Sequence, residues 1–580
     1  MNFPWLSWLV FLPLAGAVVL VSLPAAADRW HRRWAMTVAL GEFALSVPLW
    51  WRAWQPGWQL VERRAWLPAI GAEYHLGVDG ISMLLVLLTT LMTVVAVLGA
   101  FGAVRERTRE FYALVLALET GMIGTFLSLD LLLFYVFWEA MLIPMYLLIG
   151  VWGGPRRIYA AVKFFLYTMF GSLLMLVAIL SLYFMQKALT GVPTFALDAF
   201  YAMPIAPAAQ LWLFLAFALA FAIKVPMFPF HTWLPDAHVE APTAGSVILA
   251  AVLLKMGTYG FLRFALPLFP SAVAVTTPWM VALALVGIVY GALVSMVQPD
   301  LKKLVAYSSV SHLGFVMLGV AAFSTTSVTG AIYQMLNHGI STGALFFMVG
   351  MLYERRHTRL IAEFGGLKNV MPWYAAIFLM ICLSSIAVPG FNGFVGEFLI
   401  LVGSWSFSPW MVAVSSLGVI LAAGYVLWMV KRVFYGEVTN PKNQGLPDLS
   451  AREAAVLVPL VVLAIVMGVA SPAFTRRIEP SVDALVRQEP LLRTEMQVKA
   501  ENLAQAQRKY TTALSQGYRT LSELIRFRKS TAAEVQEYRY QDMAFRIFRN
   551  DALQKYRASF DMAARYAYLA AAAYDYETNL

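Results

Sequence analysis

The sequence predicts an all-α membrane protein of about 14 transmembrane helices, followed by a polar helical tail. Of its 580 residues, 60% are hydrophobic and only 13% are charged, with a mean hydropathy of +0.68. Soluble domains carry nearer a quarter of charged residues. The apolar residues also form long continuous runs, and such runs indicate membrane-spanning helices, not the alternating strands of a β-barrel.

Fourteen apolar runs account for the predicted helices, each long enough to cross about 30 Å of hydrocarbon. The first begins close to Met1 without a basic start, so we expect a retained span and not a cleaved signal peptide. The predicted spans are 3–23, 35–52, 80–103, 111–128, 131–151, 159–185, 210–229, 242–266, 278–297, 304–323, 328–352, 372–404, 409–432 and 453–474.

Basic residues in the linkers predict how the spans are oriented. Linkers after even-numbered spans contain few, apart from Arg63 and Arg64 in the second, and the seventh linker (231–242) contains none. Basic residues concentrate in cytoplasmic loops. We therefore expect the protein in a bacterial cell membrane, with the odd-numbered linkers on the cytoplasmic side and the C-terminus on the other side. The clusters in those linkers are Arg29/Arg32/Arg33, Arg105/Arg107/Arg109, Arg156/Arg157, Lys302/Lys303, Arg355/Arg356/Arg359 and Lys431/Arg432.

Composition and motifs exclude several classes of function. The net charge is +10, but the basic residues lie in short clusters between apolar runs, which is typical of membrane topology and not of a nucleic-acid surface. The single cysteine, Cys382, excludes an internal disulfide, a thiolate cluster and a CxxC pair. Phosphate-binding loops, nucleophile elbows and haem-attachment motifs are absent from the sequence, so we expect no redox or hydrolytic centre in this chain.

Two predicted spans are interrupted by helix-breaking residues. The seventh contains Lys-Val-Pro-Met-Phe-Pro at 224–229, and the twelfth contains Val-Pro-Gly-Phe-Asn-Gly at 388–393. Proline removes a backbone donor and glycine permits non-helical dihedrals, so we expect both helices to unwind there. The alternative is a pair of ordinary proline kinks.

The two breaks also predict an internal repeat. Each lies in the fourth helix of a five-helix run, 111–266 and 278–432. Because five is odd, the second run is inverted relative to the first, which is typical of transporters with a site at mid-membrane depth. The remaining parts are then three N-terminal helices (1–110), a last span (453–474) and a tail (495–580).

Ionisable residues near the centres of the predicted spans are the candidate functional residues. Inserting such a residue at the centre of a membrane helix costs roughly 2.5–3.5 kcal/mol. We therefore expect each of them to have a function or a specific partner. In chain order they are Glu119, Glu139, Lys224, Lys255, His312, His338 and Glu397.

A row of such residues can move protons, because each member can accept and release one. A lysine in a poorly solvated site binds its proton less tightly, and a nearby carboxylate restores the affinity. Histidine titrates near neutrality and suits the link between two halves. The structural alternative is a static pair of Glu139 and Lys224 that holds two helices together. Such a pair does not account for two histidines, a second lysine and a second carboxylate.

Other polar residues indicate a function less clearly. Glu42 could be a core residue or an interhelical contact, and the sequence leaves both open. Arg263 lies near the end of its span, where we expect it to reach outward to the interface. His231 and His238 lie seven residues apart across a proline, without cysteines or the HExxH spacing, which argues against a metal site. We instead expect a gate or proton exit near His231.

Three stretches resemble the antiporter-like membrane subunits of respiratory complex I, and they are most similar to subunit M, or chain 4, of the NADH-quinone oxidoreductases. They are 228–249, with His231 and His238, then 301–314, with His312, and 389–398, with Glu397. The resemblance extends over about residues 1–475.

The resemblance implies roles for residues that were already candidates because ionisable side chains are costly to insert into a membrane. The family's proton-channel residues correspond to Glu139, Lys224, Lys255 and Glu397, with His312 and His338 in the connecting central axis. A glutamate at 397 indicates the M type, because the L and N types are expected to carry lysine in the twelfth span. The resemblance also implies no cofactor in this chain. NADH, FMN, iron–sulfur clusters and quinone belong to partner subunits, and L and N type subunits are its neighbours in the bilayer.

The tail at 495–580 departs from the family, whose chains end soon after the last span. It contains nine tyrosines, dense charges and almost no glycine, so we expect it to be largely helical and outside the cytoplasm. Its near-balanced charge gives no sign of nucleic-acid binding. Three interpretations remain: a soluble adaptor, a helix that lies on the membrane or on a neighbouring subunit, and an assembly or fusion artefact.

The sequence is compatible with three classes of function. The first is a proton-translocating subunit of a quinone-reducing enzyme complex. The second is a subunit of a multisubunit cation/proton antiporter or hydrogenase-linked pump without NADH oxidation. The third is a membrane scaffold whose buried charges are static. The subunit-M-like motifs favour the first, although the second uses the same lysine and glutamate chemistry.

Overall fold

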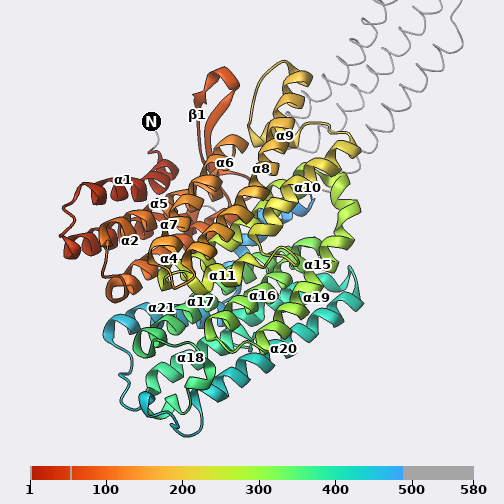
Figure 1. Ribbon diagram of the computed structural model, residues 1–580. Helices are drawn as coiled ribbons and strands as arrows, with labels where there is room; N and C mark the ends of the chain where they lie inside the picture. Colours follow the sequence, from red (N-terminus) through yellow and green to blue (C-terminus); the bar gives the residue numbers. More distant parts are fainter. Residues whose placement is uncertain (1–2, 53–54, 488–580) are drawn as a thin grey trace, which may run out of the picture.

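The computed structural model describes residues 3–52 and 55–487 as a bundle of long helices with one small β-hairpin (Figure 1). The tail at 495–580 lies outside the described residues, and so do the three interpretations of it. The described helices and strands are α1 (Trp5–Ser22), α2 (Asp28–Ser46), α3 (Leu49–Arg52), β1 (Gln59–Leu67), β2 (Ala72–Val78), α4 (Gly80–Ala103), α5 (Thr108–Leu127), α6 (Leu131–Ala140), α7 (Leu142–Trp152), α8 (Arg157–Thr190), α9 (Leu197–Tyr201), α10 (Pro207–Lys224), α11 (Trp233–Glu240), α12 (Thr243–Ile248), α13 (Leu254–Gly260), α14 (Leu266–Leu268), α15 (Pro270–Met296), α16 (Leu301–Ala322), α17 (Thr325–Arg356), α18 (Pro372–Ser385), α19 (Asn392–Trp405), α20 (Pro409–Phe434) and α21 (Ala451–Val469).

Twelve helical segments of the described chain are long and apolar enough to cross a membrane. The two predicted spans outside this set are the second and the twelfth. Helix α2 carries Arg29, Arg32 and Arg33 in its first two turns, which lower its hydropathy. The twelfth span is divided into α18 and α19, each of 14 residues. Both crossings are nevertheless required by the positions of the linkers.

The linkers after odd-numbered crossings all lie on one face of the molecule, here called the basic face. Hydrogen bonds join each of these linkers to the next. The joining pairs are His31 with Thr108 (2.8 Å), Trp152 with the Glu106 carbonyl (2.9 Å), the Gly154 amide with the Glu240 carbonyl (2.8 Å), Lys302 with the Ala241 carbonyl (2.7 Å), Arg359 with Asp300 (3.1 Å) and Arg356 with Asn443 (2.6 Å).

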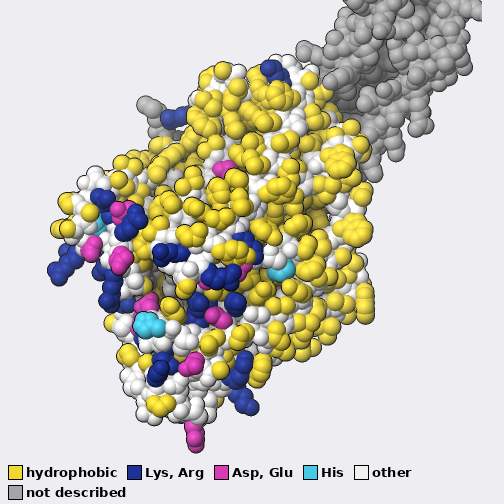
Figure 2. Space-filling view, viewed as in Figure 1, with side chains coloured by type: hydrophobic (Ala, Val, Ile, Leu, Met, Phe, Trp, Pro, Cys, Tyr) yellow, Lys and Arg dark blue, Asp and Glu magenta, His cyan; other side chains and the backbone are white. Residues whose placement is uncertain are grey.

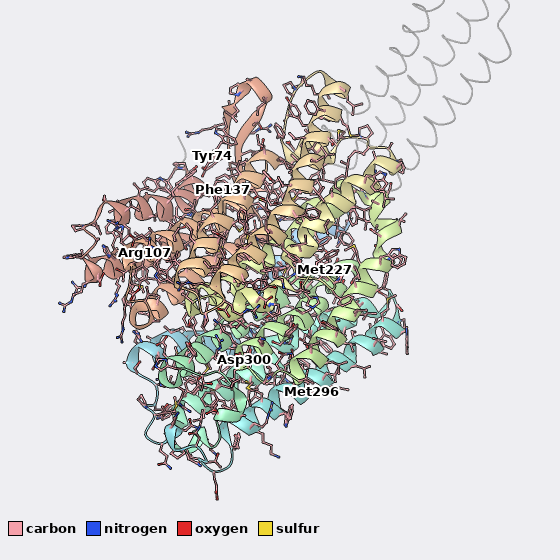
Figure 3. All side chains as sticks on the ribbon, viewed as in Figure 1. Tyr74, Arg107, Phe137, Met227, Met296 and Asp300 are labelled. Atoms are coloured by element: carbon pink, nitrogen blue, oxygen red, sulfur yellow. The ribbon has the colours of Figure 1, made fainter. Side chains whose placement is uncertain are left out.

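The linkers after even-numbered crossings lie on the opposite face, here called the hairpin face. The Leu6 amide near the N-terminus donates to Glu62 on β1 (2.7 Å), and the Gly80 amide donates to Ser481 near the end of the described chain (3.0 Å). Both ends of the span region therefore lie on the hairpin face, as predicted. Figure 3 places Tyr74 at the hairpin end and Arg107 and Asp300 away from it. In Figure 2 charged side chains gather in the left and lower parts of the visible face, and the rest is mainly hydrophobic.

The structure explains why the predicted seventh linker lacks basic residues. Most of 231–242 is helix α11, the second half of the seventh crossing, so the true linker is only Ala241–Pro242. The prediction ended this span too early, at 229. The basic residues at this linker come from elsewhere, because Lys302 donates to the Ala241 carbonyl and Arg359 donates to the Val239 carbonyl (2.8 Å).

The second linker forms the hairpin, which the sequence analysis did not predict. Strands β1 and β2 pair in antiparallel register, with a short 3-10 turn and Gly71 in the left-handed region (φ +68°) between them. Arg63 forms ion pairs with Glu73 (2.7 Å) and Asp198 (3.6 Å). These pairs account for a basic residue in a linker where few were expected.

Both predicted helix breaks are present. Helix α10 ends at Lys224 before α11 begins at Trp233, and α18 ends at Ser385 before α19 begins at Asn392. In the second break Ala387 and Gly390 adopt positive φ angles of 58° and 95°. The first five-helix run begins with α5 at the basic face and the second with α15 at the hairpin face. The domain boundaries themselves stay predictions.

The bundle contains further helix irregularities that the sequence did not reveal. Helices α6 and α7 are separated at Met141, two residues after Glu139. The eighth crossing contains two π-helical turns, Leu249–Leu253 and Phe261–Ala265, one on each side of α13. Such turns occur frequently at functional sites, and Lys255 follows the first of them.

Candidate functional site

Glu139 and Lys224 interact through their charges. Glu139 is on α6, partly buried, where it interacts with Ser172 of α8 and with the charge of Lys224. Lys224 is the last residue of α10 and is 1% exposed. Its Nζ has no hydrogen-bond partner among the described residues. The pair is therefore electrostatic and not a close ion pair.

Aromatic rings supply the immediate surroundings of the Lys224 ammonium. Its Nζ lies 5.2 Å from the Trp138 ring centroid and 5.8 Å from that of Phe164. A cation within about 6 Å of a ring face is attracted to it without a conventional hydrogen bond. This environment holds a charged lysine in place and leaves its protons unengaged. The sequence signal was available, because Trp138 directly precedes Glu139.

Lys255 and His338 form the second contact of the predicted row. Lys255 is fully buried on α13, and its Nζ lies 2.5 Å from both the His338 Nδ1 and the Ala250 carbonyl oxygen. The Ala250 carbonyl belongs to the preceding π-helical turn, five residues back. His338, on α17, is 3% exposed. The helix irregularity thus brings a backbone acceptor to the lysine.

His312 and Glu397 continue the same line of groups. The His312 ring on α16 lies 6.1 Å from the His338 ring, centroid to centroid. Its Nδ1 lies 3.0 Å from Glu397 Oε1 on α19, and its Nε2 lies 3.4 Å from the Ser385 hydroxyl. Gln334 of α17 also donates to Glu397 Oε1, at 3.0 Å. Gln334 and Ser385 were not recognised in the sequence, since neither is ionisable.

The predicted row therefore divides into two groups. Glu139 and Lys224 form one, and Lys255, His338, His312 and Glu397 form a continuous second one. Helices α10 and α13 meet between them at Gly257, where an added Cβ would lie 2.7 Å from the Phe221 carbonyl oxygen. This close contact joins α10, which ends at Lys224, to α13, which carries Lys255.

The remaining candidates lie around these groups. His231 is buried in the break between α10 and α11, where its ring packs against Tyr290 (5.1 Å) and Tyr307 (6.3 Å). Glu119 lies on α5, apart from the row, and is paired with Glu42 of α2. A role of His231 or Glu119 in the relay stays a prediction.

His238 is a buried group that the sequence analysis set aside. It is fully buried on α11, its ring stacks on Phe346 (4.4 Å, 9°), and neither ring nitrogen has a hydrogen-bond partner among the described residues. It interacts electrostatically with Lys302 at the basic face and with Lys255. His238 therefore lies between that face and the second group of the row.

The prediction that Arg263 reaches outward is wrong. Arg263 is 6% exposed and forms an ion pair with Asp79, the N-cap of α4. Its guanidinium also lies 4.4 Å from the Trp58 ring centroid. The π-helical turn Phe261–Ala265 contains Arg263, and the hairpin linker supplies Asp79, so a partner from a distant segment overrides the usual behaviour of arginine at a span end.

We expect Arg263→Ala to destabilise the protein. Removing one partner of a buried ion pair leaves an uncompensated charge, which costs about 3–5 kcal/mol. The measurement is the thermal unfolding of the purified chain in detergent, with Arg33→Ala, an exposed arginine on α2, as control. Adding Asp79→Asn to Arg263→Ala should recover part of the loss. Equal melting of Arg263→Ala and wild type would contradict this role.

Among the described residues, no group of three or more His, Cys, Asp or Glu is placed to hold a metal ion. Lys255, His338, His312 and Glu397 contact one another, Gln334 and Ser385. Lys224 Nζ, His338 Nε2 and one oxygen of Glu139 have no hydrogen-bond partner among the described residues. Such an arrangement can hold and transfer protons.

Comparison with known proteins agrees with this architecture. The chain matches the family model for NADH:quinone oxidoreductase/Mrp antiporter membrane subunits over residues 128–422. It is 48% identical over 495 residues to NADH-quinone oxidoreductase subunit M of Rhodobacter capsulatus, which covers 83% of this chain and 96% of the relative. The chain belongs to the subunit M family of the NADH-quinone oxidoreductases. The resemblance inferred from three short stretches is thus confirmed.

Solved structures show the same fold. A chain of respiratory complex I from Thermus thermophilus with bound NADH superposes with a TM-score of 0.76 at 36% identity, covering 83% of this chain and 99% of that one. A chain of the Mrp complex from Dietzia sp. DQ12-45-1b gives 0.74 at 21% identity, covering 85% and 99%. The second likeness shows a shared fold alone. The subunit M family membership separates this chain from the antiporter alternative.

Proposed function

We propose that this chain is the proton-translocating membrane subunit of an NADH-quinone oxidoreductase. In this function partner subunits transfer electrons from NADH to quinone, and the chain couples that reaction to proton pumping. The observation that carries the proposal is the buried row of Lys255, His338, His312 and Glu397 in a member of the subunit M family. Lys255 Nζ lies 2.5 Å from His338 Nδ1, the two histidine rings lie 6.1 Å apart between centroids, and His312 Nδ1 lies 3.0 Å from Glu397 Oε1.

The geometry supports a division of roles along the row. Lys224 holds a proton without a hydrogen-bond acceptor, and the charge of Glu139 sets how strongly that proton is held. Displacing Glu139 releases the proton toward the second group. His338 and His312 can each accept on one ring nitrogen and donate from the other. His338 Nε2 has no hydrogen-bond partner among the described residues, so we propose that a ring rotation or a bridging water completes the step between the two rings on the way from Lys255 to Glu397. Glu397 then receives the proton at the second helix break.

The rival static interpretation fits the second group poorly. A structural ion pair needs two opposite charges in close contact. Lys255 instead contacts a backbone carbonyl and a histidine, which can be neutral. Lys224 faces aromatic rings and has no close carboxylate. Groups held in this way can change protonation without losing a partner, which favours transfer over scaffolding.

The proposal extends to cofactors and neighbours. Members of this family work within multisubunit complexes, and we propose L and N type subunits as the neighbours. NADH, FMN, iron–sulfur clusters and quinone are then held by partner subunits, and none by this chain. Purification of the tagged chain from its own membranes tests this. Co-purification of flavin and iron–sulfur protein with NADH-quinone reductase activity is expected. Recovery with cation/proton antiporter subunits and without flavin would contradict it.

Orientation gives a separate prediction. We propose that the basic face lies on the cytoplasmic side of the bacterial cell membrane, because linkers rich in Lys and Arg are retained on that side. Cys382 is the single cysteine of the sequence and is fully buried, so an introduced cysteine becomes the accessible thiol. A cysteine in place of His357 should react with an impermeant reagent only in inverted vesicles, and one in place of Gly57 only in intact cells. Labelling of both from the same side would contradict the model.

A further inference from the structure

The helices α2, α4 and α5 enclose a pair of carboxyl groups outside the proposed relay. Glu42 on α2 and Glu119 on α5 are both fully buried. Glu42 interacts electrostatically with Glu119, so the two side chains approach each other from neighbouring helices. None of their four carboxyl oxygens has a hydrogen-bond partner among the described residues.

The surroundings contain no cation that could balance two negative charges. Helices α1 and α4, which pack against α2 and α5, contain no titratable residue in their sequences. The basic residues of α2 lie in its first two turns and Arg109 lies in the first turn of α5, in both cases at the basic face. Arg33 precedes Glu42 by nine residues, and Arg109 precedes Glu119 by ten, which is about 13–15 Å along each helix axis.

Other elements that touch α5 do not change this balance. Their acidic and basic residues are Glu139 on α6, Lys255 on α13, and Glu73 and His75 on β2, and their tyrosines are Tyr74, Tyr135, Tyr146 and Tyr259. Lys255 is engaged with His338 and the Ala250 carbonyl, and Glu139 interacts with Lys224. Tyr112, also on α5, lies near Arg32 at the basic face.

The polar side chain beside Glu119 is neutral. Thr93 of α4 interacts with the Glu119 carboxyl group, and its hydroxyl also lies 3.0 Å from the Thr89 carbonyl oxygen. Thr93 therefore adds no positive charge to the surroundings of the pair.

From this geometry we propose that Glu42 and Glu119 form a second proton-binding site, separate from the lysine–histidine row. Two carboxylates that face each other without a cation cannot both be ionised, because like charges in a poorly solvated site repel. A bound proton converts one of them into a donor for the other and satisfies oxygens that are otherwise unpaired. The pair therefore holds at least one proton at neutral pH, between the N-terminal helices and the first five-helix run.

The test is infrared spectroscopy of the full-length chain in lipid vesicles at neutral pH. Subtracting the spectrum of Glu42→Gln or Glu119→Gln from that of wild type should reveal the C=O band of a protonated carboxylic acid, which shifts in D₂O. The matched control is Glu110→Gln on α5, a partly exposed residue paired with Arg109 at 3.2 Å, which should reveal a carboxylate band instead. Loss of only carboxylate bands in both pair variants would overturn the proposal and indicate an ionised pair, such as one that holds Na⁺.

A second measurement needs no variant. Dicyclohexylcarbodiimide reacts with protonated carboxyl groups in apolar surroundings, and peptide mapping by mass spectrometry identifies the modified residue. We expect modification of Glu42 or Glu119 in the wild-type chain, and none at Glu110. Failure to modify either member of the pair would contradict the proposal. Neither measurement depends on the Lys224 relay, so failure of that relay would leave this site unaffected.

Discussion

Lys224→Met and Glu139→Gln should each reduce NADH-driven proton uptake at least about tenfold, which corresponds to 1.4 kcal/mol on the barrier. Methionine preserves contact with Trp138 and Phe164, whose rings lie 5.2 Å and 5.8 Å from Nζ, but it cannot carry a proton. Glutamine preserves the size of Glu139 but removes the charge that tunes Lys224. The measurement is proton uptake in inverted vesicles, normalised to assembled complex.

The control for this pair is Lys187→Ala, which removes an exposed lysine near the end of α8. It should leave uptake unchanged. Adding an uncoupler separates a blocked relay from a proton leak, because a leak would leave rapid quinone reduction without a gradient. Moving one charge against 100 mV costs roughly 2.3 kcal/mol, so a leak cannot imitate pumping. Wild-type uptake by both variants in normally assembled complex would show that Glu139 and Lys224 are only a structural pair.

Hydrophobic runs and linker charges were sufficient to predict most of the fold. The crossings, the common side of both ends and the two helix breaks follow from features that a sequence states directly: continuous apolar length, basic clusters, and proline or glycine inside a span. The end of the seventh span was wrong because α11 continues through Pro235, a proline that the first turn of a helix tolerates. The β-hairpin was not predicted because its strands, nine and seven residues long, are too short to be spans, and charged residues at 62–64 interrupt the apolar residues of β1.

The site was predicted from the free-energy cost of placing ionisable side chains inside a membrane. This criterion has a specific limit. It identified ionisable residues in spans, so Lys255, His338, His312 and Glu397 were chosen before their contacts were known. It could not identify Gln334 beside Glu397 or Phe164 beside Lys224, because neither residue is ionisable. It also failed for Arg263, whose partner Asp79 lies 184 residues away in the chain. Partner choice over such a separation depends on packing that no local pattern records.

Glu42 is a second case in which the sequence does not show which residues are neighbours in space. The sequence left it open between a core position and an interhelical contact, and Glu119 was grouped with the relay because of its depth. In the structure these two residues face each other from α2 and α5. Depth along a span is readable from the sequence, but the side of the helix that faces a given neighbour is not. Residues at similar depth therefore fall into separate groups, with Glu119 beside Glu42 and not in the lysine–histidine row.

Glu397→Gln should abolish coupled transport as strongly as the Lys224 variants, but for a different reason. Glu397 Oε1 lies 3.0 Å from both His312 Nδ1 and Gln334 Nε2. A glutamine at 397 can keep a hydrogen bond to either neighbour, so the second helix break should remain folded. Its amide cannot accept and release a proton near neutral pH, so protons that reach His312 have no acceptor.

The Glu397 experiment compares proton uptake with assembly in the same membranes. Glu479→Gln is the matched control, because Glu479 is exposed beyond the last span, and it should pump normally. We expect Glu397→Gln to assemble at wild-type levels, with uptake lowered at least about tenfold and quinone reduction not restored by uncoupler. Restoration by uncoupler would mean that electron transfer proceeds without this residue. Unchanged uptake would place the end of the relay elsewhere, because a continuous proton path through His312 requires an ionisable acceptor at its far end.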